Sequence, residues 1–384
     1  DLLSRENIII KKYTYLIFFT AVFMGYFEVF YSWSRVHLKS VFGNFIKEGF
    51  ARICVSFLLI AVYLGWLTND EFVYAVVLVY FFRMLIMKIY ALSIYLPRLR
   101  WNGLPANIKE IVSFSIYIIL AGSAGTILLE IDKFMIPQLK NIAEVAYYSV
   151  GVYIASVIGI PSRAMQQIIN PITAREINDE NLKEVEVLYK KSSLNLLVIG
   201  GLIFLLINTN IKELYMIIDR PEYSVGVAVV LVISVSELIK LSLGTNGAIL
   251  TNSKYYKILF YYAIAMAISV IVLNRIFIAY IGIQGAAIAT LIVVFVFSFL
   301  KIIYVYQKMK MQPFSRRTNR LLLLIGLMFA GFYFIPIMIH PILSILVKSL
   351  FISSIFIYAV FKMNISEDMN RLFKNRFGPR LTKK

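Results

Sequence analysis

The chain has 384 residues, of which 60% are hydrophobic and only 16% are charged, and its mean hydropathy is +0.78. A soluble domain is about half apolar and a quarter charged, so the composition excludes a soluble globular protein and indicates an integral membrane protein. The net charge of +18 could suggest a nucleic-acid partner, but the distribution of the basic residues argues otherwise.

Apolar runs long enough to cross a hydrocarbon core of about 30 Å as helices recur along the whole chain. Alternating strands of the outer-membrane-barrel type are absent from the sequence pattern. We therefore predict an all-α, polytopic helical bundle. The eleven predicted membrane-spanning helices are 13–33, 50–67, 71–96, 109–136, 143–162, 194–209, 223–245, 256–279, 282–304, 320–339 and 342–361.

The segments between these helices alternate in basic charge. With segment 34–49 placed inside, the inner segments hold 26 of the 39 Lys and Arg residues and the outer segments hold 6. This asymmetry is typical of the positive-inside rule, so we expect a cytoplasmic C-terminus and no nucleic-acid partner. The chain opens outside, without a methionine or a signal peptide. We therefore predict that it is N-terminally truncated and that an odd number of preceding helices is missing.

Three polar segments organise the rest of the chain. The segment 163–192 has apolar residues at helical spacing and predicts a helix along the cytoplasmic interface. A basic linker at 308–320 separates the last two predicted helices, as expected for a detachable accessory pair. The tail after residue 364 is basic and predicts binding to anionic membrane lipids. The blocks 13–96 and 223–305 are similar in length, which suggests an internal repeat.

Several motifs resemble one family of transporters. "YIGIQGAAIATLIVVFVFSFLK" (280–301) resembles a recurring helix start in the polysaccharide-flippase branch of the multidrug/oligosaccharidyl-lipid/polysaccharide exporter superfamily. "FSIYIILAGSAGTILLEIDKFMI" (114–136) is similar to the first helix of that family's second half, and "INPITAREI" (169–177) to its exit into an interfacial helix. Small residues allow close helix packing in lipid, and the first motif supplies Gly285, Ala286, Ala287 and Ala289.

The resemblance implies a two-lobed, alternating-access fold of fourteen helices, of which about eleven are present. Residues 1–105 would be the last three helices of the N-terminal lobe, with the first three absent. Residues 106–306 would be a complete six-helix C-terminal lobe that includes the interfacial helix. Residues 307–384 would be an accessory helix pair with a basic cytoplasmic tail.

The resemblance also implies a function. Family members flip undecaprenyl-pyrophosphate-linked oligosaccharide across the bacterial inner membrane in lipopolysaccharide, O-antigen or capsule biosynthesis. They need no cofactor, and an H⁺ or Na⁺ gradient is expected to drive them. Lipid-linked oligosaccharide is thus the expected substrate, and other polysaccharide-assembly proteins are expected partners.

Two basic residues lie inside the predicted helix 71–96. An ionisable group at membrane depth costs about 2.5–3.5 kcal/mol on insertion scales and usually faces a cavity or a partner. Arg83 and Lys88 are therefore candidates for the cationic lining of a substrate cavity, with pairing to another helix as the alternative. Arginine suits this role because its fork binds phosphate oxygens bidentately.

Two acidic residues, Glu28 and Glu237, occupy corresponding helices of the two blocks. They are candidates for ion coupling, and either could instead be a partner of Arg83. The simpler alternative is a local salt bridge, such as Glu237 with Lys240 at i,i+3.

Three charges follow one another at the external end of 109–136: Glu130, Asp132 and Lys133. One interpretation is an interfacial helix end at which Lys133 neutralises a carboxylate. In the other, Asp132 and Lys133 line an external mouth and belong to its gate, with Glu130 beside them and Lys133 as a cationic cavity residue.

Three polar residues near the inner end of 143–162 could line the cavity as well. Gln166, Gln167 and Asn170 can hydrogen-bond sugar hydroxyls or neighbouring helices. For Lys348, in the last predicted helix, we expect a structural role.

Enzymatic motifs are missing from the sequence: it has no cluster of metal ligands and no glycine-rich nucleotide loop. We therefore expect a transporter. A multidrug/cation antiporter is an alternative, although Arg83 and Lys88 would repel a cationic drug. A membrane-embedded glycan polymerase or glycosyltransferase is another, with acidic residues such as Glu213 in an external loop at 209–222. A non-transporting scaffold for lipid carriers is the third.

Overall fold

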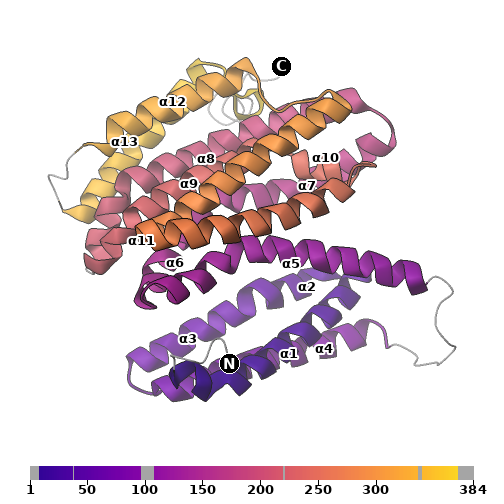
Figure 1. The fold of residues 1–384 in the computed structure, drawn as a ribbon, viewed down its shortest axis with the longest axis vertical. Coiled ribbons are helices and arrows are strands. Elements are labelled where there is room, and N and C mark those ends of the chain that lie inside the picture. Colours follow the sequence, from indigo (N-terminus) through magenta and orange to yellow (C-terminus); the bar gives the residue numbers. More distant parts are fainter. Residues whose placement is uncertain (1–7, 38, 97–107, 219–220, 336–339, 371–384) are drawn as a thin grey trace, which may run out of the picture. The chain divides into compact units, whose positions relative to one another are not determined.

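The computed structural model describes residues 8–37, 39–96, 108–218, 221–335 and 340–370. Every regular element in these ranges is a helix, which confirms the predicted all-α class. The chain divides into two compact units, Asp1–Ala106 and Asn107–Lys384. Figure 1 shows the helices of each unit.

The first unit is built on the packing of its first and last helices. Its elements are α1 (Ile8–Val36), α2 (Ser40–Phe45), the π-helical turn η1 (Ile46–Phe50), α3 (Ala51–Tyr63) and α4 (Asn69–Ile94). Phe27, Tyr31, Ile46 and Met87 form the core between α1, η1 and α4. A capping box fixes the start of α4, because the Thr68 hydroxyl accepts from the Glu71 N–H and the Glu71 carboxylate accepts from the Thr68 N–H.

The second unit is arranged around α8. Its elements are α5 (Ile108–Leu139), α6 (Ala143–Ser156), η2 (Val157–Gly159), α7 (Ile160–Asn178), α8 (Leu182–Ile218), η3 (Pro221–Gly226), α9 (Val227–Ser242), α10 (Asn246–Thr251), α11 (Lys257–Met309), α12 (Arg316–Tyr333) and α13 (Pro341–Lys362). Helices α7, α9, α12 and α13 all pack against α8. The centre of this unit is therefore apolar and helical throughout its described part.

Helix α11 turns back on itself halfway along. Ile281 and Gly282 do not have helical dihedral angles, and Gly282 has a φ of 62° and a ψ of −143°. A residue with a Cβ rarely adopts this conformation. The two halves then pack side by side through Val270 in the first half and Val293 and Phe297 in the second (Figure 1). The turn lies where the sequence predicts a short loop between two spans.

The small residues after this turn pack as predicted. Gly285, Ala286, Ala287 and Ala289 are all buried. A Cβ at Gly285 would lie 2.1 Å from the carbonyl oxygen of Phe277. The two halves of α11 can therefore approach this closely only with glycine at that position.

Seven of the described helical segments are long and apolar enough to cross a membrane. They are Tyr13–Ser34, Asn69–Ile94, Ala143–Gln166, Leu182–Ile218, Glu222–Ser242, Lys257–Met309 and Pro341–Lys362. One of them is α11, whose two halves hold two predicted spans. Three further predicted spans lie in α3, α5 and α12, which are not among the seven. The polytopic membrane class is thus confirmed, whereas the number eleven stays a prediction.

The predicted external loop at 209–222 is wrong over most of its length, because α8 continues to Ile218. The polar run at 208–210 suggests a helix end, but these side chains bond to carbonyls of their own helix. Asn208 donates to Phe204 at 3.0 Å, and Asn210 donates to Leu206 at 2.8 Å. Such i to i−4 bonds satisfy polar side chains without ending a helix.

The single interfacial helix predicted over 163–192 is also wrong in its boundaries. Helix α7 ends at Asn178, Glu180 has a positive φ of 54°, and residues 182–192 form the first part of α8. The apolar positions Val185 and Tyr189 of that part pack in a buried cluster. Their helical spacing reflects burial within the protein.

The last two helices share a core with the rest of the second unit, contrary to the expected detachable pair. Ile325 of α12 and Phe356 of α13 are buried in one cluster with α8, and a Cβ at Gly201 of α8 would lie 2.4 Å from Ile325 Cδ1. Beyond α13, Asn195 of α8 donates to Asp368 at 2.8 Å. The pair is therefore packed along α8 and tied to it by a hydrogen bond.

Candidate functional site

A buried carboxylate with three polar partners lies in the second unit. Asp132 of α5 is only 4% exposed. It accepts hydrogen bonds from the Tyr148 hydroxyl of α6, from Asn274 Nδ2 at 2.5 Å and from Thr290 Oγ1 at 2.9 Å. We call these four residues the Asp132 cluster.

The turn in α11 explains how two of these partners meet. Asn274 lies eight residues before Gly282, and Thr290 lies eight residues after it. In a straight helix they would be about 24 Å apart along the axis. Because α11 folds back at Gly282, both side chains reach the same carboxylate.

The Asp132 cluster holds a negative charge without a positive partner. All three donors are neutral, and no ion pair to Asp132 is formed by the residues that the structure describes. A buried ionised carboxylate is costly unless it is paired or coordinates a cation. The site is therefore suited to take up a proton or a cation.

A second feature of the cluster points in the same direction. Asn274 Oδ1 is buried, and within the described ranges it has no hydrogen-bond partner. Carboxylate, amide and hydroxyl oxygens are the ligands that hard cations prefer. One carboxylate matches the charge of a monovalent ion.

The structure separates the three charges that follow one another in α5. Lys133 pairs with Glu130 at 2.7 Å, one helical turn away, and the Glu130 side chain is 57% exposed. Asp132 points into the protein, away from this pair. The charge neutralisation expected of Lys133 is thus present, whereas the hydrogen bonds of Asp132 come from neutral side chains. The gate role stays a prediction.

A cationic cluster lies in the first unit. Arg83 of α4 is 7% exposed, donates from Nη2 to the Lys47 carbonyl at 3.1 Å, and places its guanidinium 4.1 Å from the centre of the Phe27 ring. Lys47 pairs with Glu28 at 2.8 Å. Among the described residues, Glu28 forms its ion pair with Lys47 and none with Arg83, so the partnership of Glu28 with Arg83 stays a prediction.

The charges of this cluster do not cancel. Arg83 and Lys47 are positive and Glu28 is the one carboxylate that pairs with either of them within the described ranges. Arg83 Nε is buried and has no partner there. Lys47 lies in the π-helical turn η1, and such turns are frequent at functional sites. The cluster is therefore suited to receive an anionic group such as phosphate.

The other predicted site residues do not join either cluster. Glu237 pairs with Lys240 at 2.8 Å, which confirms the local salt bridge. Lys88 is exposed. Gln166 is exposed and donates to Ser162 at 3.0 Å. Asn170 is exposed as well, and the side chain of Gln167 lies outside the described residues.

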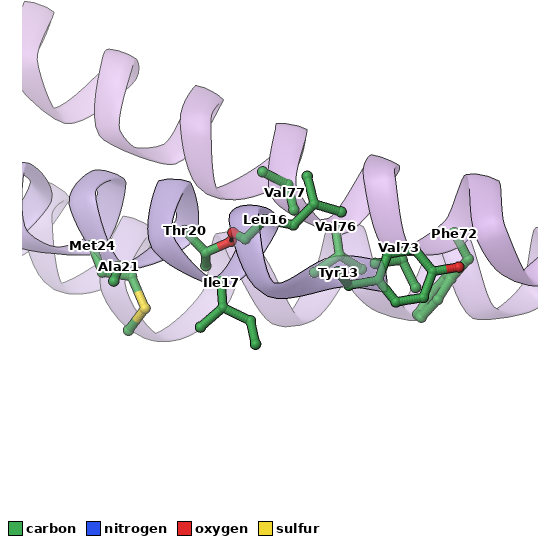
Figure 2. A pocket seen from close by; sticks show the side chains of 10 residues that line it. All are labelled: Tyr13, Leu16, Ile17, Thr20, Ala21, Met24, Phe72, Val73, Val76 and Val77. Carbon is green, nitrogen blue, oxygen red and sulfur yellow. Dashed lines mark hydrogen bonds between the residues drawn. The ribbon is translucent and has the colours of Figure 1, made fainter. Parts of the chain in front are cut away.

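An apolar pocket of about 390 Å³ lies between α1 and α4. Figure 2 shows its lining, which includes Leu16, Ile17 and Met24 of α1 and Val73 and Val77 of α4. No ionisable acid or basic side chain contributes to it. The pocket therefore suits hydrocarbon, and charged groups must be recognised elsewhere.

Sequence reasoning missed the partners of Asp132. A lone Asn inside an apolar helix is a usable signal for Asn274, and its equal spacing with Thr290 around Gly282 is a second one. Tyr148 could not be identified from the sequence as a partner of Asp132, because Tyr is common in this chain. Lys47 was missed because its segment was assigned to an inner loop.

A comparison with known protein families finds a match for residues 21–194. They match the family described as polysaccharide biosynthesis protein, and the matched segment runs from α1 into the first part of α8. No curated protein and no solved structure gives a significant match. The family match agrees with the resemblance to polysaccharide flippases, and it supports a role in polysaccharide biosynthesis or export. Residues 21–194 of this chain are therefore similar to the family of polysaccharide biosynthesis proteins.

Proposed function

We propose that this protein flips lipid-linked oligosaccharide across the bacterial inner membrane and that an ion gradient drives it through Asp132. The observation that carries the proposal is the buried carboxylate with three neutral donors, in a membrane protein of a polysaccharide biosynthesis family. A purely structural carboxylate that is buried this completely in a protein is normally paired with a cation. An ion from solution supplies the missing charge.

The geometry suggests how binding of an ion affects the fold. The cluster joins α5, α6 and both halves of α11. A bound Na⁺ or H⁺ neutralises Asp132 and lowers the cost of keeping these helices closed around it. Release restores the charge and favours an arrangement that admits water. Ion binding thereby shifts the balance between two conformations, as coupled transport requires.

The cationic cluster of the first unit supports an anionic substrate. The pyrophosphate of an undecaprenyl-linked oligosaccharide matches the positive charge of Arg83, which forms no ion pair among the described residues, and the arginine fork can bind two phosphate oxygens. The same charge disfavours the alternative of a cationic drug. The glycan polymerase alternative loses Glu213 from its acidic loop, since Glu213 lies in α8 and is paired.

The test replaces Asp132 by Asn in the host. The chromosomal gene is deleted, and the full gene is supplied as wild type, Asp132→Asn or Glu130→Gln. Glu130 is a matched control because it lies on the same helix but is exposed. Lipid-linked oligosaccharide in spheroplasts is then oxidised with a membrane-impermeant reagent that attacks sugars on the outer face.

We expect Asp132→Asn to lower the outward-facing oligosaccharide at least tenfold, because the loss of a buried charge interaction costs about 1.5–3 kcal/mol. Glu130→Gln should match the wild type. Export by Asp132→Asn at the wild-type level contradicts the coupling role. If units reach the outer face in the deletion strain and only fail to polymerise, the protein is a polymerase.

A further inference from the structure

A small polar pocket of about 260 Å³ lies in the second unit and shares no residue with the Asp132 cluster. Helix α8 contributes one side of it, and α12, α13 and the residues after α12 contribute the rest. Its lining residues are Asn208, Thr209, Lys212, Glu213, Tyr333, Phe334, Ile335 and Lys348. Under the predicted topology, the pocket opens near the outer ends of these helices.

A buried ion pair lies at the pocket. Lys348 is 9% exposed and forms an ion pair with Glu213, which is 1% exposed. Lys348 also donates to the Ile335 carbonyl at 3.2 Å, and Ser344 donates to Glu213 at 3.3 Å. Glu213 is thus neutralised, and one of the three N–H donors of Lys348 is left for a ligand.

A second lysine makes the pocket positive. Lys212 Nζ lies 4.9 Å from the centre of the Tyr333 ring, and among the described residues no carboxylate pairs with it. Two lysines and one carboxylate leave a local charge of one positive unit. Lys212 is exposed, so its ammonium group can reach a ligand that enters from the membrane surface.

The pocket also contains an unused hydrogen-bond acceptor. Asn208 is 1% exposed, and within the described ranges its Oδ1 has no partner, while its amide group donates to Phe204. The phosphodiester group of a lipid cannot satisfy this oxygen by itself, because it lacks a hydrogen-bond donor. A hydroxyl group on the same ligand can.

From these contacts we infer that the pocket binds the headgroup of an anionic phosphoglycerol lipid. The phosphate would lie between Lys212 and Lys348, and a glycerol hydroxyl would donate to Asn208 Oδ1. The volume is below the roughly 300–1,000 Å³ of sites for drug-sized ligands, which fits a headgroup and is too small for an oligosaccharide. Tyr333, which also lines the pocket, is of an aromatic type that is enriched at membrane interfaces.

The test measures lipid binding by the purified full chain in a neutral detergent. The probes are short-chain phosphatidylglycerol, short-chain phosphatidylcholine and inorganic phosphate, and the readout is the dissociation constant from calorimetry. The variants are Lys212→Gln, Lys212→Arg and Lys140→Gln. Lys140 is a matched control because it is also exposed in the second unit but lies far along the chain from the pocket.

We expect phosphatidylglycerol to bind the wild type at least tenfold more tightly than phosphatidylcholine. Lys212→Gln should weaken phosphatidylglycerol binding roughly tenfold, as expected for one charge-assisted hydrogen bond. Lys212→Arg should restore most of the affinity, and Lys140→Gln should change nothing.

Three outcomes overturn the inference. Equal binding of the two lipids shows that the headgroup is not recognised. Inorganic phosphate that binds as tightly as phosphatidylglycerol identifies a free anion as the ligand. Equal losses from Lys212→Gln and Lys140→Gln indicate a general surface charge effect. Because the assay needs no glycan transport, its result is independent of the proposed flippase activity.

Discussion

At the scale of single residues, the buried ion pair of Glu213 and Lys348 allows a direct test of how much a paired buried charge contributes to stability. We expect Glu213→Gln to lower the free energy of unfolding by about 3 kcal/mol, because Lys348 then remains buried without its counter-charge. Thermal unfolding of the purified protein in detergent measures this. Glu130→Gln, at an exposed pair, should change stability by less than about 1 kcal/mol.

A double variant separates the charge from the packing. Glu213→Leu combined with Lys348→Met removes both charges and keeps similar volumes, and such replacements are often neutral or stabilising. We therefore expect the double variant to be more stable than Glu213→Gln. If Glu213→Gln unfolds like the wild type, the pair is not buried in the folded protein as described.

The charged residues also show which contacts a sequence can predict. Pairs one helical turn apart, such as Glu237 with Lys240, follow from spacing alone. The pair of Glu213 with Lys348 spans 135 residues, and the bond from Asn274 to Asp132 spans 142. No local pattern encodes such contacts, because they depend on how distant helices pack. The sequence therefore identified Asp132 as a candidate but not the residues around it.

At the scale of elements, the turn in α11 determines whether the Asp132 cluster exists. Gly282 has a φ of 62°, and another residue in such a conformation costs about 1–3 kcal/mol. We expect Gly282→Ala to shift one half of α11, separate Asn274 from Thr290, and lower oligosaccharide export as Asp132→Asn does. The spheroplast oxidation assay measures it.

Gly326→Ala is the control for this prediction. Gly326 lies within α12, and a Cβ added there meets no atom within 4 Å, so export and stability should not fall. Normal export by Gly282→Ala would show that the glycine conformation does not set the geometry of the cluster.

Helix positions followed well from apolar runs, whereas helix ends did not. The turn near residue 282 was predicted, because one predicted span ends at residue 279 and the next begins at residue 282. The end of α8 was missed, because Asn208, Thr209 and Asn210 interrupt the apolar run while bonding to their own helix. A run of polar residues indicates a helix end only where their side chains do not hydrogen-bond to carbonyls of their own helix.

At the scale of the whole molecule, the seven apolar helical segments establish a polytopic membrane protein, and its residues 21–194 match a family of polysaccharide biosynthesis proteins. Orientation in the membrane is a separate property, since helix packing does not distinguish inside from outside. The sequence does distinguish them, through 26 basic residues in the inner segments against 6 in the outer ones. The orientation decides from which side the ion proposed for Asp132 would enter.

We therefore expect the C-terminus to be cytoplasmic. A fluorescent protein that folds only in the cytoplasm should be bright when fused after Lys384, and alkaline phosphatase at the same point should be inactive. Alkaline phosphatase inserted after Asn141, between α5 and α6, should be active, because the predicted topology places that connection outside. Under this orientation the Asp132 cluster lies near the outer ends of α5 and of both halves of α11, so an ion that enters from outside reaches it over a short path. The opposite reporter pattern would place Asp132 near the cytoplasm and rule out direct loading from the outer side.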